Sequence, residues 1–377
     1  MNILITGGAG FIGSNLALKL VDGGHMVTVL DTLSPQIHGS TPELSSSLYL
    51  SIKDKVRFVK GSVTNEDDWK LVLPGQDAIV HLAAETGTGQ SMYEIKRYVD
   101  INVGGTALLL DLLANGPHTV TKIVVASSRS IYGEGKYRSE ALGIVYPGSR
   151  KEEDMRSGQF ELLCPETGTP MVLLPTDEDS KIHPSSVYGI TKQNQEQMVL
   201  TVCGSLGIGA TALRYQNVYG PGQSLSNPYT GILSIFSTRI KNNNGINIFE
   251  DGKESRDFVF IDDVVDATIL ALIKGEASGE VFGIGSGVAT NVLSVAQSLI
   301  KYYGVDVPVK VTGEFRIGDI RHNYADLTKA KNVLNFSPKI DFESGIQNFV
   351  AWVNGQDVQN DTYEESIQEM KKRGLFK

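Results

Sequence analysis

The first 32 residues constrain the fold of this chain more than any other stretch. Residues 2–6, Asn-Ile-Leu-Ile-Thr, form a short apolar run that predicts a buried strand. Glycines follow at positions 7, 10 and 13, and the apolar residues of 14–20 have helical spacing. A second apolar run, 26–30, ends at Asp31, which lies 18 positions after the third glycine. We therefore expect a strand, a glycine-rich turn, a helix and a second strand.

The three glycines and Asp31 suit a dinucleotide. Gly7 allows the tight turn, Gly10 lets the backbone approach a pyrophosphate, and Gly13 lets helix and strand pack closely. The amides at the start of the helix face the phosphates, where the helix dipole favours negative charge. Asp31 can accept hydrogen bonds from an adenine ribose and would repel a 2′-phosphate, so NAD is favoured over NADP. The alternative is a glycine-rich turn in an unrelated α/β domain, but strand, glycines, helix and acid together favour the dinucleotide.

Further strands and helices alternate along the chain. Apolar runs at 56–59, 77–82, 122–126 and 210–214 predict strands separated by helical stretches, which indicates an α/β fold with a doubly wound parallel (Rossmann) sheet. We predict an NAD-binding domain over 1–214, with an insertion at 134–180 near the mouth of the site. The segment at about 255–280 is expected to return to that domain. Residues 215–254 and 281–377 then form a smaller α/β substrate-binding lobe and a charged C-terminal tail that we expect to end in a surface helix.

Composition excludes several classes of protein. The net charge of −9 and the pI of about 5.3 do not suit binding to nucleic acid or to an anionic membrane surface. No apolar run reaches the roughly 20 residues that span a bilayer. Two cysteines, Cys164 and Cys203, cannot form a disulfide framework. We therefore expect a cytoplasmic protein.

Two further segments carry the residue types of a proton-transfer site. Ser128 follows the predicted strand 122–126, at the strand end where ligands bind in open parallel sheets. Tyr188 and Lys192 are four residues apart and share one face of a helix. A neighbouring ammonium, aided by the positive nicotinamide, is expected to lower the phenol pKa from about 10, so that Tyr188 can act as a base. Alternatively, they are an ordinary surface pair. His81 is another conceivable base, but its place in an apolar strand favours packing.

Six stretches together resemble a known family. They are 6–13 (Thr-Gly-Gly-Ala-Gly-Phe-Ile-Gly), 81–84 (His-Leu-Ala-Ala), 102–106 (Asn-Val-Gly-Gly-Thr), the serine segment 126–133, 188–192, and 213–221 (Leu-Arg-Tyr-Gln-Asn-Val-Tyr-Gly-Pro). The pattern is similar to that of the extended short-chain dehydrogenases/reductases, which include nucleotide-sugar epimerases and dehydratases. The resemblance runs from residue 1 to about 345 and implies an NAD-dependent enzyme.

The resemblance also implies a set of site residues. Ser128, Tyr188 and Lys192 would be catalytic, and Thr86, Ser128, Arg129 and Asn217 would contact substrate. The implied cofactor contacts are Gly7, Gly10, Phe11, Ile12, Gly13, Asp31, Ser62, Val63, Leu82, Ala83, Ala84, Asn102, Tyr188 and Lys192. Ser62 departs from the family pattern, which usually has an Asp that contacts adenine. Gln216 replaces a common Phe near the nicotinamide end.

The serine segment discriminates among reactions within the family. The 4,6-dehydratases carry Asp-Glu there, whereas this chain has Arg129-Ser130, so elimination of water is disfavoured. Ser128 matches the serine that epimerases keep. The implied reaction is C4 epimerisation through a 4-keto intermediate, with NAD tightly bound and regenerated in each turnover. A non-catalytic NAD-sensing protein would typically have lost the Tyr or the Lys.

A closer resemblance concerns the sugar. The segments 86–94, 132–137, 163–165 and 226–231 look like those of the bacterial dTDP-L-rhamnose 4-epimerase group, which interconverts dTDP-L-rhamnose and dTDP-6-deoxy-L-talose. UDP-glucose or UDP-glucuronate 4-epimerases are the alternative. Related sequences often carry several cysteines in the insertion that resemble a small metal site. Only Cys164 is present here, so we predict no metal.

An anionic nucleotide sugar needs local cations on this acidic chain. Arg256 and Arg316 match two family arginines that hold the diphosphate, and Arg can bond phosphate oxygens bidentately. Asn217 matches a residue that donates to the phosphate. The alternative for each arginine is an ion pair, for example Arg256 with Asp257 or Asp262. In the family, helices corresponding to 92–115 and 186–206 form a dimer interface, so the resemblance implies a homodimer.

Overall fold

The computed structural model describes residues 1–227, 229 and 231–377. Its centre is a seven-stranded sheet in the order β13-β9-β5-β4-β1-β2-β3, and every neighbouring pair is parallel. The strands are β1 (Asn2–Thr6), β2 (Met26–Asp31), β3 (Arg57–Lys60), β4 (Ala78–His81), β5 (Lys122–Ser128), β9 (Gly209–Tyr215) and β13 (Glu280–Ile284). The predicted doubly wound parallel sheet is confirmed.

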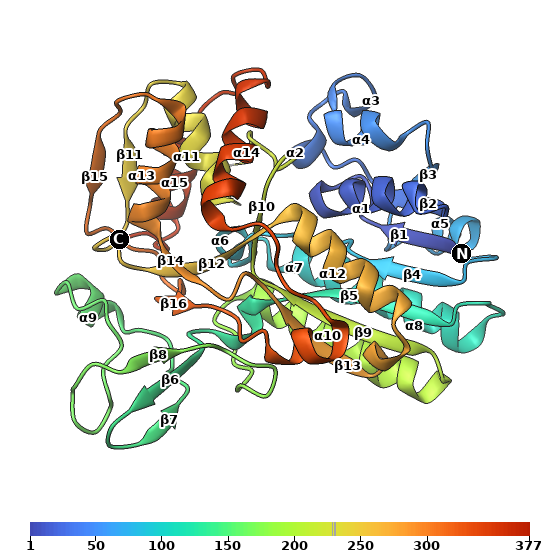
Figure 1. Cartoon of the computed structure of the whole chain (residues 1–377), viewed down its shortest axis with the longest axis horizontal. Coiled ribbons are helices and arrows are strands. Elements are labelled where there is room, and N and C mark those ends of the chain that lie inside the picture. The colour runs from blue at the N-terminus through green and yellow to red at the C-terminus, as the bar shows by residue number, and fades with distance from the viewer. Residues whose placement is uncertain (228, 230) are drawn as a thin grey trace.

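Helices cover both faces of this sheet (Figure 1). One face carries α1 (Phe11–Asp22) and α12 (Ile261–Ile273), which pack on each other. The other carries α5 (Glu66–Val72), α8 (Gly105–Asn115) and α10 (Val187–Leu206). Ile3 and Ile5 belong to the core on the α1 side, and Leu4 to the core on the α10 side. Because successive side chains of a strand point to opposite faces, β1 is apolar throughout.

Short helical segments follow β2, β4 and β5, at the edge where the strands end. After β2 come α2 (Pro35–His38), α3 (Pro42–Ser45) and α4 (Ser47–Ile52). After β4 come α6 (Thr88–Ser91), α7 (Ile95–Tyr98) and a π-helical turn, Val99–Gly104. A 3₁₀ turn, Arg129–Tyr132, follows β5. Connections at this edge carry the site, as expected for an open parallel sheet.

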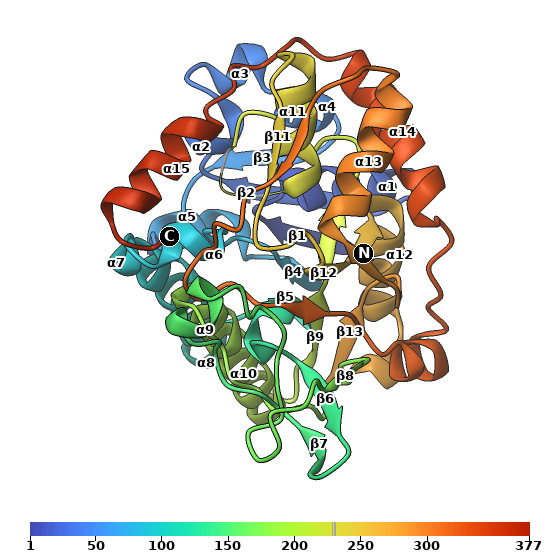
Figure 2. The same ribbon diagram turned by 90° about the vertical axis from the view of Figure 1, so that its left-hand side faces the viewer.

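The insertion is attached beside the smaller lobe, below it in Figure 1 and also at the bottom of Figure 2. It contains an antiparallel sheet of β6 (Lys136–Ser139), β7 (Gly143–Val145) and β8 (Val172–Leu174), in the order β7-β6-β8. The helix α9 (Glu152–Arg156) lies between β7 and β8 in the sequence. The insertion rejoins the lobe at an isolated bridge between Thr176 and Ala325.

The smaller lobe contains two small sheets and four helices. One sheet joins β10 (Asn217–Tyr219), β12 (Ser255–Phe260), β14 (Ala289–Asn291) and β16 (His322–Asn323), and the other pairs β11 (Ile246–Ile248) with β15 (Val309–Val311). Its helices are α11 (Ile232–Lys241), α13 (Val292–Tyr303), α14 (Phe342–Asn354) and α15 (Tyr363–Lys372). Short turns at Gly275–Ala277 and Ala330–Leu334 pack beside β13 of the main sheet. One apolar core runs from α1 into α11, α13 and α14, so the lobe is packed on the sheet domain.

The division between the two parts differs in detail from the predicted boundaries. In the segment 255–280, α12 returns to the main sheet, whereas β12 belongs to a sheet of the lobe. The strand β13 pairs with β9 in the main sheet, although the prediction assigned residues from 281 onward to the lobe. This run is only five residues long and contains a glycine, so its pattern is too short to show which sheet it joins. Among the described residues, the structure contains no helix that is both long and apolar enough to cross a bilayer.

Candidate active site

A single large cavity runs along the carboxyl ends of the central strands and continues into the lobe. Its volume is about 620 Å³, in the usual range for small-molecule sites. The glycine-rich turn and Asp31 line one end, Ser128, Tyr188 and Lys192 line the middle, and Arg256 and Arg316 line the other end. The structure thus brings nearly all predicted site residues to one cavity. The exception, Asn102, is described below.

The glycine-rich turn has the close backbone packing that a dinucleotide site requires. A Cβ on Gly13 would lie 2.4 Å from the carbonyl oxygen of Gly7, and Gly7 itself has a φ of +67°. The helix α1 starts directly after Gly10, and no side chain caps its first amides. These amides and the helix dipole favour an anion at this end of the cavity. The turn therefore fits a pyrophosphate.

Asp31 lies beside this turn, as the sequence predicts. Its Oδ2 accepts a hydrogen bond from the Ala9 amide at 3.0 Å, and its Oδ1 accepts one from the Leu33 amide at 2.8 Å. The His38 ring approaches Oδ1 to 4.0 Å, and burial lowers the pKa of His38 more than the charge of Asp31 raises it. The carboxylate is fixed at the cavity edge and keeps further acceptor capacity for ribose hydroxyls.

The remaining predicted cofactor contacts line the same end of the cavity, with one correction. Those that line it are Phe11, Ile12, Ser62, Val63, Leu82, Ala83 and Ala84. Asn102 does not line the cavity; its side chain is fully buried. Its Oδ1 accepts from the Glu85 amide at 2.7 Å, and its Nδ2 donates to the Glu85 carbonyl and to Thr191. Asn102 therefore ties the loop after β4 to α10, beneath the wall of the cavity.

The backbone around Tyr188 is fixed from both sides. The hydroxyl of Ser186 caps α10 by accepting from the Gly189 amide at 3.1 Å. The Tyr188 amide donates to Ser91 Oγ at 3.0 Å, which joins the start of α10 to α6. Ser128 ends β5, and its hydroxyl accepts from the Ser130 amide at 3.2 Å. Tyr188, near the start of α10, and Ser128, at the end of β5, thus line the same cavity from two rigid elements.

Burial acts on both titratable groups of the predicted pair, Tyr188 and Lys192. Burial raises the pKa of the Tyr188 phenol, while the Ser128 hydroxyl and the charge of Arg129 act in the opposite direction. Burial also lowers the pKa of Lys192 to about 7, against the raising effect of Glu196. The Nζ of Lys192 donates to Gln195 Oε1 at 2.7 Å. In the protein alone, desolvation therefore dominates the pKa of the phenol. The lowering of this pKa by Lys192 together with the positive nicotinamide stays a prediction.

His81 has a structural role, as the sequence favours. It is 1% exposed, and its ring nitrogens contact Thr6 Oγ1 at 2.8 Å and Thr106 Oγ1 at 3.0 Å. Burial and the charge of Lys192 lower its pKa to about 3. The ring is therefore neutral at ordinary pH and links β1, β4 and α8 beneath the cavity.

At the lobe end, Asp319 lies between the two predicted arginines. Its Oδ1 accepts from Arg256 Nη2 at 3.0 Å and its Oδ2 from Arg316 Nη2 at 2.7 Å. Burial alone would raise the pKa of Asp319, but Arg316, Arg256 and Arg150 hold it well below its usual range. The ion-pair alternative for Arg256 is thus realised with Asp319, whereas Asp257 accepts from backbone amides of other loops.

Arg129 and Asn217 lie between the two ends of the cavity. Arg129 Nε donates to Asn217 Oδ1 at 2.8 Å. Burial and the charge of Arg256 lower the pKa of Arg129 to about 9. Thr86 also lines the cavity, and its carbonyl accepts from Tyr98 at 2.6 Å. These residues form the polar part of the cavity wall next to Ser128 and Tyr188.

The sequence analysis missed two parts of the wall. Asp319 lies three residues after Arg316, which was predicted, but its role depends on contacts with both Arg316 and Arg256. The helix α15 was expected to be a surface helix, yet Tyr363, Ile367 and Met370 line the cavity. Its apolar side chains recur every three to four residues, a helical spacing that could have indicated a buried face. The last residues also pair with the lobe, since the amide and carbonyl of Phe315 bond to Lys377.

Comparison with known proteins identifies the family. The model of the NAD dependent epimerase/dehydratase family matches residues 3–150 and 165–285. The chain is 38% identical over 354 residues to a dTDP-L-rhamnose 4-epimerase of Burkholderia thailandensis, covering 93% of this chain and 94% of that one.

Two solved structures have the same fold. The UDP-glucose 4-epimerase of Thermotoga maritima, solved with UDP-glucose, is 31% identical with a TM-score of 0.74, and covers 94% of this chain and 99% of its own. A variant of the UDP-glucuronic acid 4-epimerase of Bacillus cereus, in complex with UDP-4-deoxy-4-fluoro-glucuronic acid and NAD, is 26% identical with a TM-score of 0.75 and the same coverage.

Proposed function

This chain belongs to the NAD-dependent epimerase/dehydratase family, and we propose that it is a nucleotide-sugar 4-epimerase whose substrate is dTDP-L-rhamnose. One observation carries the proposal: a single cavity contains the dinucleotide turn, the Ser128–Tyr188–Lys192 set and two arginines at its far end. The similarity to the enzyme of Burkholderia thailandensis supports the choice of sugar. The product would be dTDP-6-deoxy-L-talose, formed through a 4-keto sugar.

The cofactor end fits NAD by its own chemistry. Gly7, Gly10 and Gly13 would lie against the pyrophosphate, and Asp31 would accept hydrogen bonds from the adenine ribose. When bound, NAD supplies an acceptor that takes a hydride from the sugar and gives it back. The residues of the chain orient the sugar, move its proton and exclude water from the cavity.

Tyr188 is the proposed acid and base. Its phenol would take the proton of the sugar 4-hydroxyl and later return it, and Ser128 would hold the same oxygen by a hydrogen bond. Because burial raises the pKa of the phenol, the phenolate needs positive charge close by. Arg129 already acts in that direction, and Lys192, with its pKa at about 7, can carry charge at neutral pH.

The diphosphate would be held by Arg256 and Arg316 through charge-assisted hydrogen bonds. The Nε of Arg316 is buried and has no hydrogen-bond partner among the described residues, which supports an acceptor at this position. A grip on the diphosphate rather than on the sugar leaves the 4-keto ring free to turn. The ring could then present its other face to the bound cofactor, so that the hydride would return to the opposite side of C4, which epimerisation requires.

The structure of the serine segment disfavours dehydration. Elimination of water across a sugar needs an acid and a base next to the reacting carbons. The two residues after Ser128 are Arg129 and Ser130, and the Arg129 guanidinium is bonded to Asn217. A UDP-glucose or UDP-glucuronate 4-epimerase would use the same residues, so the nucleotide sugar has to be decided by experiment.

The test is an assay of the purified protein without added NAD. dTDP-L-rhamnose, UDP-glucose and UDP-glucuronate are supplied one at a time, and the C4 epimers are separated by chromatography and identified by NMR. We expect interconversion of dTDP-L-rhamnose and dTDP-6-deoxy-L-talose. Turnover of a UDP sugar alone would overturn the assignment of the rhamnose substrate while leaving the reaction class intact.

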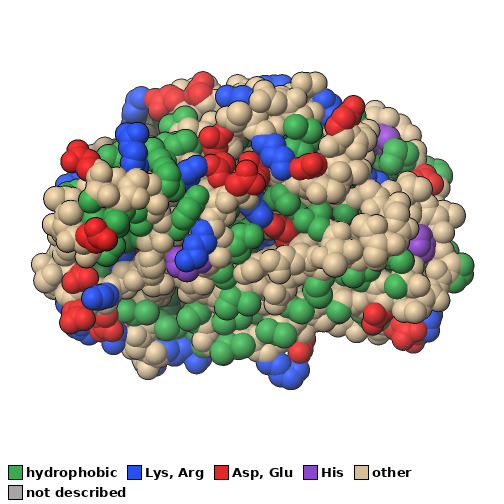
Figure 3. All heavy atoms as spheres, turned by 90° about the horizontal axis from the view of Figure 1, so that it is seen from below, with side chains coloured by type: hydrophobic (Ala, Val, Ile, Leu, Met, Phe, Trp, Pro, Cys, Tyr) green, Lys and Arg blue, Asp and Glu red, His purple; other side chains and the backbone are tan. Residues whose placement is uncertain are grey.

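We also propose that the enzyme is a cytoplasmic homodimer. The face shown in Figure 3, over which α8 and α10 run, mixes apolar patches with charges of both signs. Large apolar side chains are exposed at Ile95, Val99 and Ile190, in helical segments that contact one another. Sedimentation velocity would detect the dimer, and Ile95→Glu should shift the population toward the monomer. A monomeric wild-type protein at micromolar concentration would contradict this proposal.

A further inference from the structure

The insertion 134–180 has no role in the function proposed so far. The family model passes over residues 151–164, so this part of the insertion lies outside the pattern shared by the family. In the structure, however, the insertion is joined to the lobe by buried charged side chains rather than by apolar contacts alone. Buried ion pairs form only where several hydrogen bonds satisfy both partners, so their arrangement indicates what the insertion holds in place.

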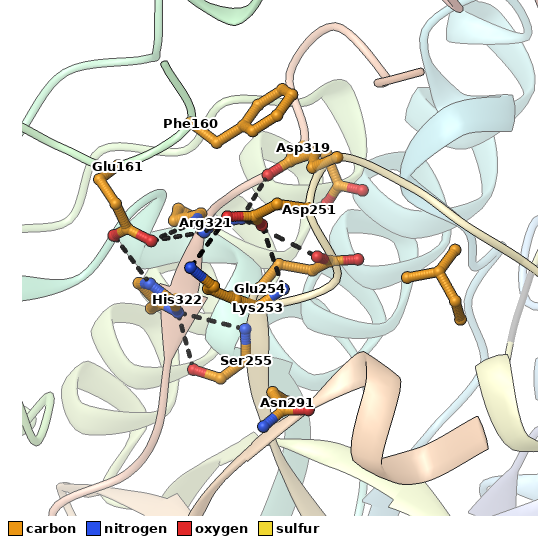
Figure 4. Close-up of polar contacts among 12 residues, drawn as sticks. Phe160, Glu161, Asp251, Lys253, Glu254, Ser255, Asn291, Asp319, Arg321 and His322 are labelled. Atoms are coloured by element: carbon orange, nitrogen blue, oxygen red, sulfur yellow. Dashed lines mark hydrogen bonds and ion pairs between the residues drawn. The ribbon is translucent and has the colours of Figure 1, made fainter. Parts of the chain in front are cut away.

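Glu161 makes the first of these contacts (Figure 4). The side chain of Arg321 is fully buried, and its Nε donates to Glu161 Oε1 at 3.0 Å, with a second contact from Nη2. The other oxygen of Glu161 lies 3.2 Å from His322 Nε2. On its far side, Arg321 Nη1 bonds to Glu250 at 2.8 Å and Asp251 at 2.7 Å. Glu161 therefore connects the insertion to a residue two positions after Asp319.

Arg150 makes the second contact, and its side chain is only 4% exposed. Its Nη1 and Nη2 bond to the two oxygens of Glu250 at 2.8 and 2.7 Å. Nη2 also donates to the backbone carbonyl of Asp319 at 3.0 Å. Its Nε lies 3.2 Å from Glu134 Oε1, and Glu134 Oε2 accepts from the Arg321 amide at 2.6 Å. Arg150 and Glu134 thus hold the backbone at both ends of the segment 319–321.

That segment determines where the diphosphate arginines lie. The Asp319 carboxylate accepts from Arg256 and Arg316, and the carbonyls of Ile320 and Arg321 accept from Arg256. Arg150 therefore acts on both arginines through Asp319. We propose that the insertion positions the diphosphate-binding arginines, and that Arg150 and Glu161 are the positioning residues through which it does so. This inference rests on the proposed function, because it takes the ligand at this end to be a nucleoside diphosphate.

The consequence is a defect in nucleotide binding that spares the chemistry. Without Arg150, the segment 319–321 loses a fixed carbonyl and Glu250 loses its bidentate partner. Arg256 and Arg316 remain, but their shared carboxylate is no longer held in place. The loss of a well-placed hydrogen bond to a charged group can weaken binding by about 10- to 100-fold. We therefore expect KM for the sugar nucleotide to rise by about 10- to 100-fold, with kcat within a few-fold of wild type.

The experiment compares Arg150→Met with Arg156→Met. Arg156 lies in the same insertion but, within the described part of the chain, pairs with Glu152 alone on an exposed helix face, so it is a matched control. Isothermal titration calorimetry gives the Kd of dTDP and of UDP, and the NAD content of each purified protein is measured separately. We expect Arg150→Met to bind the preferred nucleotide about 10- to 100-fold more weakly, with unchanged NAD content, while Arg156→Met binds as wild type.

Two further variants keep the test decisive if Arg150→Met does not fold. Arg150→Lys retains the charge but not the bidentate contact, and it should recover part of the affinity. Glu161→Gln changes a half-exposed side chain and should weaken nucleotide binding less than Arg150→Met does. Folded variants that bind dTDP and UDP with wild-type Kd would overturn the proposal, as would equal weakening by Arg156→Met. Failure of turnover with intact dTDP binding would instead count against the proposed function.

Discussion

The two ends of the cavity bind negative charge in different ways. At the cofactor end, Gly7, Gly10 and Gly13 come from one short turn, and the donors are backbone amides at the start of α1. At the lobe end, Arg256 and Arg316 come from β12 and from a loop 60 positions later, and both bond to Asp319. Amides of a helix terminus are neutral donors that need no counter-ion. Buried guanidinium groups do need one.

This difference shows how much of each end depends on the rest of the chain. The cofactor end binds through backbone amides and requires only that no side chain fill the turn. The glycines of the turn itself meet this requirement. The positions of Arg256 and Arg316 depend on the carboxylate of Asp319. The position of Asp319 depends in turn on Arg150, which bonds to its backbone carbonyl. The cofactor end should therefore tolerate distant substitutions better than the lobe end does. The following predictions test this contrast.

The largest effect is expected between the two ends, at Tyr188. Tyr188→Phe removes the proposed acid and base but little volume, so kcat should fall by about 10²- to 10⁴-fold. NAD content and the Kd of dTDP should stay unchanged, because neither end is altered. Steady-state kinetics, acid release of NAD and calorimetry measure the three quantities. Undiminished turnover would refute the role of Tyr188.

The next largest effect concerns the backbone site. Gly13→Ala places a methyl group 2.4 Å from the Gly7 carbonyl oxygen. Overpacking of about 1–3 kcal/mol would weaken NAD binding by about 10- to 100-fold. Gly204→Ala is the control, because a Cβ there meets nothing within 4 Å in α10. The NAD content of Gly13→Ala should fall while dTDP binding is retained; a full complement of NAD would show that the turn is not the cofactor site.

A smaller effect is expected at the arginine site. Arg316→Met removes a charged donor whose Nε is buried and unpartnered among the described residues. The loss of a hydrogen bond to a charged group, about 1.5 kcal/mol or more, should weaken dTDP binding by at least about 10-fold. NAD content should not change. Calorimetry at two salt concentrations checks both the size of the loss and its electrostatic origin, and equal dTDP affinity in wild type and variant would remove Arg316 from the binding site.

The smallest effect is in the pH dependence of stability. Burial and the charge of Glu250 raise the pKa of Glu254 from 4.5 to about 7. Between pH 4.5 and about 7, the folded protein therefore binds more protons than the unfolded chain does. The contribution of Glu254 to the free energy of unfolding is complete below pH 4.5 and is lost as the pH rises through about 7.

Urea unfolding at several pH values between 4.5 and 8.5 tests this sign. Gln in place of Glu254 imitates the neutral carboxyl, so Glu254→Gln should lose less stability than wild type over the range. Glu153→Gln, at an exposed position of α9, serves as the control and should follow the wild-type curve. If the free energies of unfolding of wild type and Glu254→Gln changed with pH in parallel, the raised pKa of Glu254 would be contradicted.

The same contrast explains what could be predicted from the sequence. The turn, α1 and Asp31 lie within 31 residues, so their spacing alone indicates a dinucleotide site. Ser128 was found because it follows a predicted strand, and Tyr188 because it lies four residues before Lys192 on one face of a predicted helix. The doubly wound sheet follows from the alternation of these patterns.

What was missed depends on contacts between distant segments. The role of Asp319 appears only once the fold brings Arg256, 63 positions earlier, to its carboxylate. Asn102 resembled a cofactor contact, but a π-helical turn points its amide into the backbone of Glu85. The phenol pKa of Tyr188 depends on burial, which no local spacing reveals. Long-range packing decided all three.

The proposed reaction can be tested most directly by the fate of the hydrogen at C4 of the sugar. The purified protein, without added NAD, is mixed with dTDP-L-rhamnose deuterated at C4 in ordinary water, and both epimers are examined by NMR and mass spectrometry. If a hydride leaves C4 and returns within the closed cavity, the deuterium remains at C4 of the product. Replacement of that deuterium by a solvent proton, or the absence of a C4 epimer, would contradict the mechanism.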